Sequence, residues 1–207
     1  VNSMPDIAMK PNRRLLLFLP LAHVFARYMQ FFCFAGNVSL GLSSNLKTIL
    51  ADFKAFKPTF ILAVPRIFEK IYNAASQKAG AGFKGRVFAD ATQTAYDWSH
   101  AQQSGGSIPL ALNAKHALYN KLVYSSIMEV FGGHVEYAVS GGAPLDSSIA
   151  HFFNGVGLPL LEGYGMTETC APSSVNPTEG YKIGTIGLPL QGVTMGVDEE
   201  GELCIKS

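Results

Sequence analysis

Residues 162–169 read EGYGMTET and place an aromatic ring, a hydroxyl and a carboxylate within a few positions of one another. Glycines on both sides of Tyr164 let the backbone bend closely around a ligand, and the ring could stack on a nucleotide base. Thr167 offers a hydroxyl and a backbone N–H to a phosphate oxygen. Glu168 offers a hard carboxylate oxygen, which Mg²⁺ accepts together with substrate phosphates. The pattern predicts a loop that binds a nucleotide and magnesium; a solvated polar loop is the alternative.

A second loop, SGGAP at residues 140–144, also consists of small residues. Such residues let a flat ligand approach the backbone, whose N–H and C=O groups can bind the edge of an adenine. An ordinary strand-to-helix turn has the same composition, so the sequence leaves both interpretations open. The SGGAP loop directly follows the predicted strand 134–139, and EGYGMTET follows the apolar residues LPLL (158–161) of the next predicted strand. Parallel sheets bind their ligands at this carboxyl edge, which makes both loops candidates for a ligand site.

The elements that must position these loops alternate along the chain. Short apolar runs predict buried strands, and segments with helical spacing lie between them. The expected strands are residues 15–20, 37–42, 59–65, 134–139 and 158–164. The expected helices are residues 23–35, 46–57, 66–77, 86–102, 111–131 and 146–155, the last with Asp146 as its N-cap. The alternation predicts an α/β fold with a parallel sheet and helices on both faces.

The pattern of alternating apolar runs and helical segments ends near the C-terminal end of the sequence. We expect residues 1–176 to form an α/β subdomain, with a helical insertion at about 79–131. After Pro177 the chain has short β runs separated by glycine turns and lacks helical spacing. Residues 177–207 are therefore expected to add a short antiparallel β element, the start of a β-rich subdomain that the chain truncates.

Composition narrows the class of protein. The chain has 207 residues, of which 48% are hydrophobic and 15% charged, enough to bury a core and to exclude general disorder. A net charge of +1 argues against nucleic acid as a partner. Three scattered cysteines favour free thiols in a reducing, cytoplasmic compartment. The apolar stretch 15–36 is interrupted by Pro20, His23 and Arg27, which predicts a strand, a loop and a helix in place of a membrane span.

Charge is nevertheless unevenly distributed. Residues 1–128 carry fourteen basic and five acidic residues, whereas residues 129–207 carry two basic and ten acidic residues. One interpretation is that the two halves neutralise each other within the fold. The other is a basic surface for a polyanionic ligand or an anionic membrane, which would make the protein peripheral at the membrane.

The two loops lie within a larger resemblance. GYGMTET, with SGGAPL upstream and KIGTIGLPLQGV downstream, resembles the adenylate-forming superfamily of acyl-CoA synthetases, luciferases and peptide-synthetase adenylation domains. LPLAHVFAR and VPRIFEKIY, with the helical insertion between residues 66 and 135, are most similar to long-chain fatty-acid–CoA ligases. The resemblance implies an enzyme with fatty acid, ATP and coenzyme A as substrates and Mg²⁺ as cofactor. A fatty carboxylate attacks the α-phosphate of ATP, and coenzyme A then displaces AMP from the acyl-adenylate.

The resemblance also implies a role for individual residues. The nucleotide would be held by the two loops, namely Gly142, Ala143, Pro144, Glu162, Gly163, Tyr164, Gly165, Met166 and Thr167. Glu168 would hold the metal. The acyl carboxylate would lie beside His23, Gly142 and Ala143, and the catalytic groups would be Thr167, Glu168 and His23.

His23 has a second interpretation, because it stands between an apolar strand and an apolar helix and could be a structural histidine. The nearby Phe31, Phe32 and Phe34 are expected in the core and not in a fatty-acid tunnel.

The resemblance has gaps. A phosphate-binding loop upstream, a ribose-binding aspartate and a C-terminal domain with a catalytic lysine are missing from the sequence. We therefore expect a central fragment of the large N-terminal domain that cannot complete either half-reaction alone. Three alternatives remain open: a ligase for another carboxylic acid, a non-catalytic nucleotide- or acyl-binding module, and a membrane-anchored structural segment.

Overall fold

The computed structural model describes residues 11–207, which form a seven-stranded sheet and a two-stranded hairpin. The sheet has the order β2-β1-β3-β4-β5-β6-β7. Its strands are β1 (Arg14–Leu17), β2 (Ser39–Leu42), β3 (Phe60–Ala63), β4 (Tyr137–Ser140), β5 (Leu160–Met166), β6 (Ala171–Val175) and β7 (Leu188–Pro189). The first five pair in parallel, and β6 and β7 continue the sheet in antiparallel orientation. The predicted α/β fold with a parallel sheet is confirmed.

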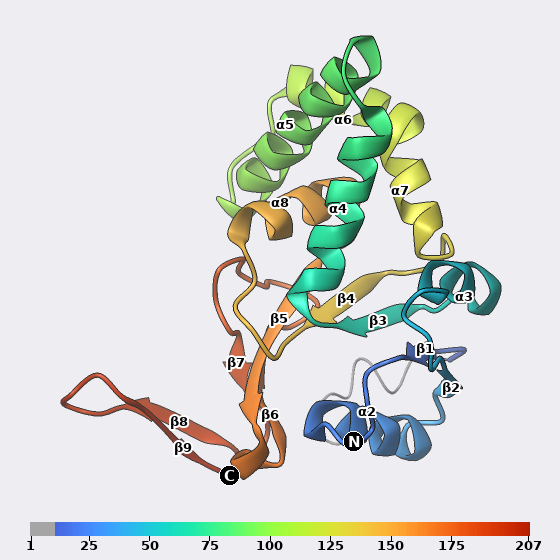
Figure 1. Ribbon diagram of the computed structural model, residues 1–207. Coiled ribbons are helices and arrows are strands. Elements are labelled where there is room, and N and C mark those ends of the chain that lie inside the picture. Colours follow the sequence, from blue (N-terminus) through green and yellow to red (C-terminus); the bar gives the residue numbers. More distant parts are fainter. Residues whose placement is uncertain (1–10) are drawn as a thin grey trace.

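Helices cover both faces of the sheet (Figure 1). One face packs against α2 (Val24–Ala35), and the other against α3 (Ile49–Phe56), α4 (Pro65–Ala79), α7 (Ser125–Val130) and α8 (Ser147–Val156). An outer layer consists of α5 (Phe83–Gln103), which packs on α8, and α6 (Leu110–Tyr119).

The single helix expected at 111–131 is divided into α6, a π-helical turn (Asn120–Tyr124) and α7. The wider turn changes which face of the helix is buried. Helix α6 has no buried residue, whereas Tyr124 and Ile127 after it are buried, and the Tyr124 hydroxyl donates to Ala91 O at 2.7 Å.

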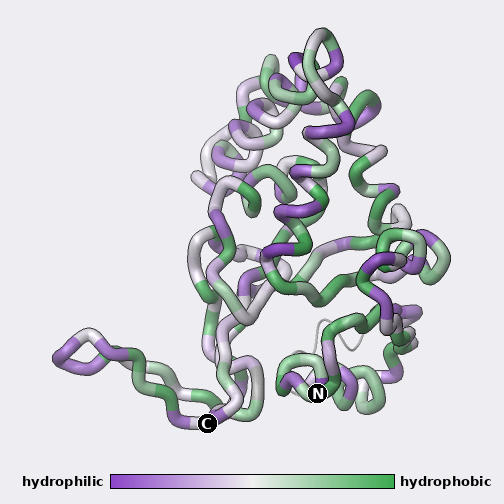
Figure 2. The backbone as a smooth tube through the Cα atoms, viewed as in Figure 1, coloured by the Kyte–Doolittle hydropathy of each residue, from purple (hydrophilic) through white to green (hydrophobic). Residues whose placement is uncertain are grey.

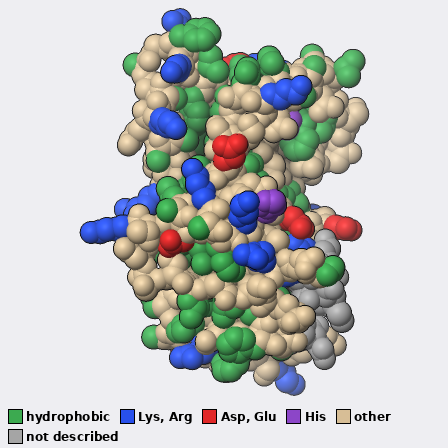
Figure 3. Space-filling model, turned by 90° about the vertical axis from the view of Figure 1, so that its right-hand side faces the viewer, with side chains coloured by type: hydrophobic (Ala, Val, Ile, Leu, Met, Phe, Trp, Pro, Cys, Tyr) green, Lys and Arg blue, Asp and Glu red, His purple; other side chains and the backbone are tan. Residues whose placement is uncertain are grey.

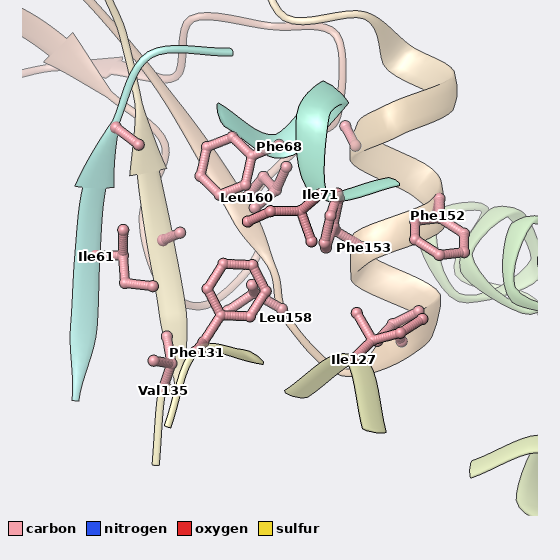
Figure 4. Packing of buried hydrophobic residues seen from close by; sticks show 14 of the residues in the cluster. Ile61, Phe68, Ile71, Ile127, Phe131, Val135, Phe152, Phe153, Leu158 and Leu160 are labelled. Carbon is pink, nitrogen blue, oxygen red and sulfur yellow. The ribbon is translucent and has the colours of Figure 1, made fainter. Parts of the chain in front are cut away.

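Alternate residues of each strand enter two separate cores. Leu15, Leu17 and Leu62 pack with α2, whereas Leu16 and Ile61 face the helices on the other side. Figure 4 shows this second core, where side chains such as Phe68 and Phe153 point from the helices onto the sheet. Burial on both faces explains why the strand sequences are continuously apolar and do not alternate with polar residues.

Local signals set where several helices begin. Pro65 occupies the first turn of α4, where its missing N–H costs no hydrogen bond. Asp146 is the N-cap of α8, as predicted, and its carboxylate accepts N–H bonds from Ser148 at 2.7 Å and Ile149 at 3.4 Å. Hydrogen bonds from Ser148, through its side chain and its backbone, hold the pKa of the Asp146 carboxyl below its usual value.

The C-terminal part leaves the main sheet as the hairpin of β8 (Thr194–Val197) and β9 (Leu203–Lys206), which extends away from the domain (Figure 1). Its tip is hydrophilic, whereas β3 in the main sheet is hydrophobic (Figure 2). The predicted antiparallel element is confirmed. The boundary that we expect at residues 176 and 177 falls between β6 and β7 and stays a prediction.

The expectation for the phenylalanines of α2 was wrong in two of three cases. Phe32 is buried, but the side chains of Phe31 and Phe34 are 62% and 66% exposed. The buried stripe consists of Ala26, Met29, Phe32 and Cys33, at helical spacing, and the other two rings lie off that stripe. Within residues 11–207, every helix is too short or too polar to cross a membrane.

Candidate active site

A cavity of about 270 Å³ lies at the carboxyl ends of β4 and β5. Its walls come from three segments far apart in the sequence: the start of α2, residues 140–142 after β4 (the SGG loop), and the end of β5 with the turn that follows. The lining residues are His23, Val24, Phe25, Gly141, Gly142, Gly163, Tyr164, Gly165, Met166, Thr167, Glu168 and Pro172. The two loops and the histidine that the sequence singled out therefore share one cavity.

Strand β5 changes partners where it enters the cavity. Its first part pairs in parallel with β4, and from Gly163 onward it pairs in antiparallel with β6, with an irregularity between Tyr164 and Gly165. A β-bulge of this kind bends a strand and reorients its side chains. The Tyr164 side chain is half-buried and Gly165 is exposed, so the strand presents one ring and open backbone to the cavity.

A short 3₁₀ turn, Thr167–Thr169, holds the hydroxyl and carboxylate at the cavity mouth. The Thr169 hydroxyl accepts from Met166 N at 3.4 Å, donates to Met166 O at 3.2 Å, and receives a bond from the buried Ser173 hydroxyl at 2.9 Å. Thr167 and Glu168 are exposed and line the cavity. Thr169 and Ser173 therefore brace the turn, and the two residues between Met166 and Thr169 are free to contact a ligand.

The SGG loop approaches β5 and α2 very closely. A Cβ on Gly141 would lie 3.2 Å from the Gly163 carbonyl oxygen and 3.2 Å from the Phe25 ring. The next residue, Gly142, has a φ of +82°, in the region that favours glycine. The loop can therefore border the cavity only with backbone atoms at these two positions.

His23 caps a helix and also lines the cavity. It is the N-cap of α2, and its Nδ1 accepts from Phe25 N at 3.3 Å. The side chain is also exposed and lines the same cavity as the nucleotide loop, by which we mean residues 162–169. The cap fixes Nδ1 as an acceptor, so the other ring nitrogen, Nε2, carries the proton of the neutral imidazole.

Three of the predicted site residues do not line the cavity. Ala143 and Pro144 follow Gly142 in the chain and are exposed. Glu162 is partly buried, and its Oε1 accepts a hydrogen bond from Leu145 N at 3.1 Å. Conversely, the sequence did not predict Val24, Phe25 and Pro172, which line the cavity, and it indicated Gly141 only as part of the SGGAP loop. Proximity to His23 in the first turn of a helix was the one available signal for Val24 and Phe25.

Comparison with known proteins agrees with this geometry. The sequence model of a family described as AMP-binding enzyme matches residues 1–207. The chain belongs to this family. Its relatives include the long-chain-fatty-acid–CoA ligase FadD15 of Mycobacterium bovis, 44% identical over 198 residues, which cover 96% of this chain and 33% of the relative. Long chain acyl-CoA synthetase 3 of Arabidopsis thaliana is 33% identical, with 92% of this chain and 30% of the relative covered. The chain thus spans about a third of the length of these relatives.

Solved structures share the fold. The N-terminal domain of FACL13 from Mycobacterium tuberculosis aligns with a TM-score of 0.62 at 18% identity, over 99% of this chain and 42% of that one. The o-succinylbenzoate coenzyme A synthetase of Bacillus subtilis, solved in complex with ATP and magnesium, aligns with a TM-score of 0.59 at 17% identity, over 96% and 32%.

The oxygen atoms of the turn fit a magnesium ion that is bound mainly through its substrate. Mg²⁺ in nucleotide enzymes is bound by one or two carboxylates, substrate phosphates and water, not by a cage of protein ligands. Among residues 11–207, no group of three His, Cys, Asp or Glu side chains could form such a cage. Glu168 and Thr167 supply one carboxylate and one hydroxyl at an open cavity, which is the donor set that this mode requires.

Proposed function

We propose that this chain provides the acyl-adenylate site of an AMP-forming long-chain fatty-acid–CoA ligase. The single observation that supports this is the shared cavity, which the nucleotide loop, the SGG loop and His23 all line. A solvated polar loop or an ordinary turn would have no reason to converge with the other two segments. The relatives named as long-chain fatty-acid–CoA ligases give the substrate class.

In this proposal the nucleotide is bound between the two loops. The Tyr164 ring stacks on the adenine, and the backbone at Gly163, Gly165 and Met166 follows the nucleotide. Gly142 lets the second loop approach the edge of the base. Ala143, Pro144 and Glu162 act indirectly, because they fix the path of that loop without lining the cavity.

The turn after β5 binds the charged part of ATP. Thr167 donates its hydroxyl to a phosphate oxygen, and Glu168 holds Mg²⁺. The bound metal neutralises charge on the phosphates and makes pyrophosphate a better leaving group. Bracing by Thr169 and Ser173 keeps both groups in place while that charge develops, which is the positional requirement for stabilising a transition state.

The reaction proceeds in two displacements. A carboxylate oxygen of the fatty acid attacks the α-phosphorus of ATP, the bond from that phosphorus to the bridging oxygen breaks, and pyrophosphate leaves. The sulfur of coenzyme A then attacks the acyl carbon, a thioester forms, AMP leaves, and the thiol proton is released. His23, which lines the same cavity as Glu168, lies beside the carboxylate in this proposal and can donate a hydrogen bond from Nε2 to its oxygen.

Calorimetric titration of the 207-residue chain tests the nucleotide assignment. AMP and ATP are titrated with and without Mg²⁺. Tyr164→Ala is expected to weaken both nucleotides about tenfold, because one stacked base is lost. Glu168→Gln should abolish the gain from Mg²⁺ and leave AMP binding unchanged. Glu200→Gln, on the exposed tip of the β8–β9 hairpin, is the matched control and should change neither.

Two results would count against the proposal. ATP binding that is the same with and without Mg²⁺, in wild type as in Glu168→Gln, would indicate a non-catalytic binding module. Equal AMP affinity of wild type and Tyr164→Ala would show that the Tyr164 ring does not stack on the nucleotide. Non-hydrolysable palmitoyl- and benzoyl-adenylate analogues then separate a long-chain ligase, which should prefer the first, from a ligase for aryl acids.

A further inference from the structure

A second cavity lies on the side of the sheet away from α2, between α4, the start of α5, and α7 with the π-helical turn before it. Its volume is about 570 Å³, within the range of about 300–1,000 Å³ that is usual for small-molecule sites. It shares no residue with the candidate active site. In Figure 3, hydrophobic side chains lie between Lys and Arg side chains in the upper half of the view, which the helices form. The fold therefore offers a second place for a ligand, separate from the nucleotide loop.

Apolar side chains line most of this cavity. Ile71, Phe88 and Ile127 form a buried floor that belongs to the core on this side of the sheet. Leu122, in the π-helical turn, also lines it and is 63% exposed. On α4, Ile71 and Lys78 both line the cavity, seven residues apart, which corresponds to about 10 Å of helix. The lining thus extends along α4 for about two turns, as the binding of a linear apolar chain requires.

The two ends of the cavity differ in charge. At one end Lys78 and Lys84 line it, on either side of the connection between α4 and α5. At the other end lie Leu50 of α3 and Val130 of α7, two helices that pack against each other. Figure 1 shows α3 beside the sheet, whereas the connection lies at the far end of α4. The exposed Glu129 adjoins Val130, so acidic charge lies near the second end, and only the first end would attract an anion.

The carboxylates of α5 do not neutralise the basic end. Asp90 forms an ion pair with Lys115 at 2.8 Å. Asp97 accepts a hydrogen bond from Gln93 at 2.8 Å and lies thirteen residues from Lys84, about 20 Å along the helix. Neither carboxylate lines the cavity, and within residues 11–207 neither of the two lining lysines forms an ion pair. Their ammonium groups are therefore available to an anionic ligand.

We propose that this cavity, which we call the helical pocket, is an accessory binding site for a long-chain carboxylate. The carboxylate lies between Lys78 and Lys84, and the alkyl chain extends over Ile71 toward Leu50. Ammonium groups donate charge-assisted hydrogen bonds to a carboxylate, while the methylenes of the same lysine side chains cover apolar surface. Burial of the chain on the apolar floor supplies the rest of the affinity.

Charge also sets the orientation of the ligand. In the reverse orientation the carboxylate would lie near Glu129 and the methyl end would lie between two ammonium groups, and both placements are unfavourable. The helical pocket is therefore matched to a linear molecule with one anionic end. This site goes beyond the proposed ligase reaction, does not rest on it, and uses no residue of the candidate active site.

Photolabelling of the 207-residue chain with dodecanoate that carries a diazirine at its methyl end tests the proposal. Mass spectrometry of the peptides then distinguishes the helical pocket from the candidate active site. We expect the label in α3 and α7, which form the apolar end. Unlabelled dodecanoate should compete at about tenfold lower concentration than dodecanol, which lacks the charge, and dodecyltrimethylammonium should not compete. Octanoate, four methylenes shorter, should compete at least tenfold more weakly than dodecanoate.

Variants of the lining locate the head group and the chain. Lys78→Gln and Lys84→Gln should each weaken dodecanoate about threefold and leave dodecanol unchanged, because each removes one exposed charge. Ala74→Trp places an indole in the helical pocket from an exposed position on α4 and should abolish labelling. Lys206→Gln in the hairpin and Ala111→Trp at an exposed position on α6 are the matched controls and should change nothing.

Circular dichroism confirms that every variant is folded before it is compared with wild type. Labelling confined to the candidate active site would overturn the proposal, as would equal labelling of Ala74→Trp and Ala111→Trp. Equal competition by dodecanoate and dodecanol would remove the role of the two lysines and would also overturn it. A dimer in analytical ultracentrifugation that Ala74→Trp dissociates would instead assign the helical pocket to a second copy of the chain.

Discussion

The Glu162 carboxylate accepts a hydrogen bond from the backbone N–H of Leu145 at 3.1 Å, and this bond joins the two loops of the candidate active site. Glu162 lies in β5 just before the cavity, and Leu145 is the buried residue that ends the SGGAPL loop. The loop at β4 is therefore fixed to the strand that carries the nucleotide loop. A motif residue that does not face the cavity can still determine the shape of the cavity.

Glu162→Ala tests whether Glu162 acts by holding the SGG loop in place and not by contacting the nucleotide. Loss of the acceptor leaves the Leu145 N–H without a partner in a partly buried place, which we expect to lower the free energy of unfolding by about 1–2 kcal/mol. AMP affinity should fall as well, because the SGG loop is released. Glu162→Gln keeps an acceptor oxygen and should retain most of both. Urea unfolding and AMP titration measure the two quantities; equal affinity in the Ala and Gln variants would contradict this role.

Thr169→Val tests whether the turn is braced by its hydroxyl. Valine keeps the volume but loses the bonds to Met166 and Ser173, so Thr167 and Glu168 are held less firmly. We expect Mg²⁺-dependent ATP binding to weaken about fivefold, with a loss of about 1 kcal/mol in the free energy of unfolding. Thr92→Val in α5 is the control, because the Thr92 hydroxyl has no hydrogen-bond partner among residues 11–207. Unchanged Mg²⁺ dependence in Thr169→Val would show that the hydroxyl is dispensable.

Much of the fold could be predicted because the sequence marks it locally. Apolar runs such as LLLF and FILA form strands that are buried on both faces, and Asp146 and Pro65 begin the helices that they were expected to begin. The two loops meet because consecutive parallel strands end at the same edge, a property of the fold class that does not depend on side-chain detail.

Side-chain directions could not be predicted in the same way. The positive φ of Gly142 turns the chain so that Ala143 and Pro144 leave the cavity, and composition does not reveal such a turn. Phe31 and Phe34 were assigned to the core by residue type, whereas their position around the helix decided their exposure. Phe25 reaches the cavity only because α2 begins at its edge, a relationship between distant segments.

The stability of the helical layer should depend on pH through His151. Its side chain is buried, its Nδ1 lies 2.9 Å from the Ser99 hydroxyl, and the ring stacks on His100 at 3.9 Å. Burial, and to a lesser extent the charge of His100, lower the pKa of His151 below its usual value near 6.5. The unfolded chain therefore binds more protons at mildly acidic pH, and the free energy of unfolding should decrease as pH falls below about 6.5.

Urea unfolding between pH 7.5 and pH 5 measures this dependence for wild type and His151→Gln. The variant should be less stable at neutral pH, because packing and the bond to Ser99 are disturbed, but its stability should vary less over this range. His134→Gln, at an exposed position before β4, is expected to keep the wild-type pH profile. A parallel profile for His151→Gln and wild type would assign the acid sensitivity to other groups.

Close contact between α5 and α8 depends on Gly155. A Cβ at this position would lie 2.1 Å from the Ala95 carbonyl oxygen and 2.5 Å from the Ala95 carbonyl carbon, and backbone atoms cannot move aside without separating the helices. Gly155→Ala should therefore lower the free energy of unfolding by about 3 kcal/mol, although alanine is the better helix former. Gly106→Ala, in open space with no strained φ, should change it by less than about 0.5 kcal/mol. If both variants unfold at the same urea concentration, the two helices are not held at this distance in solution.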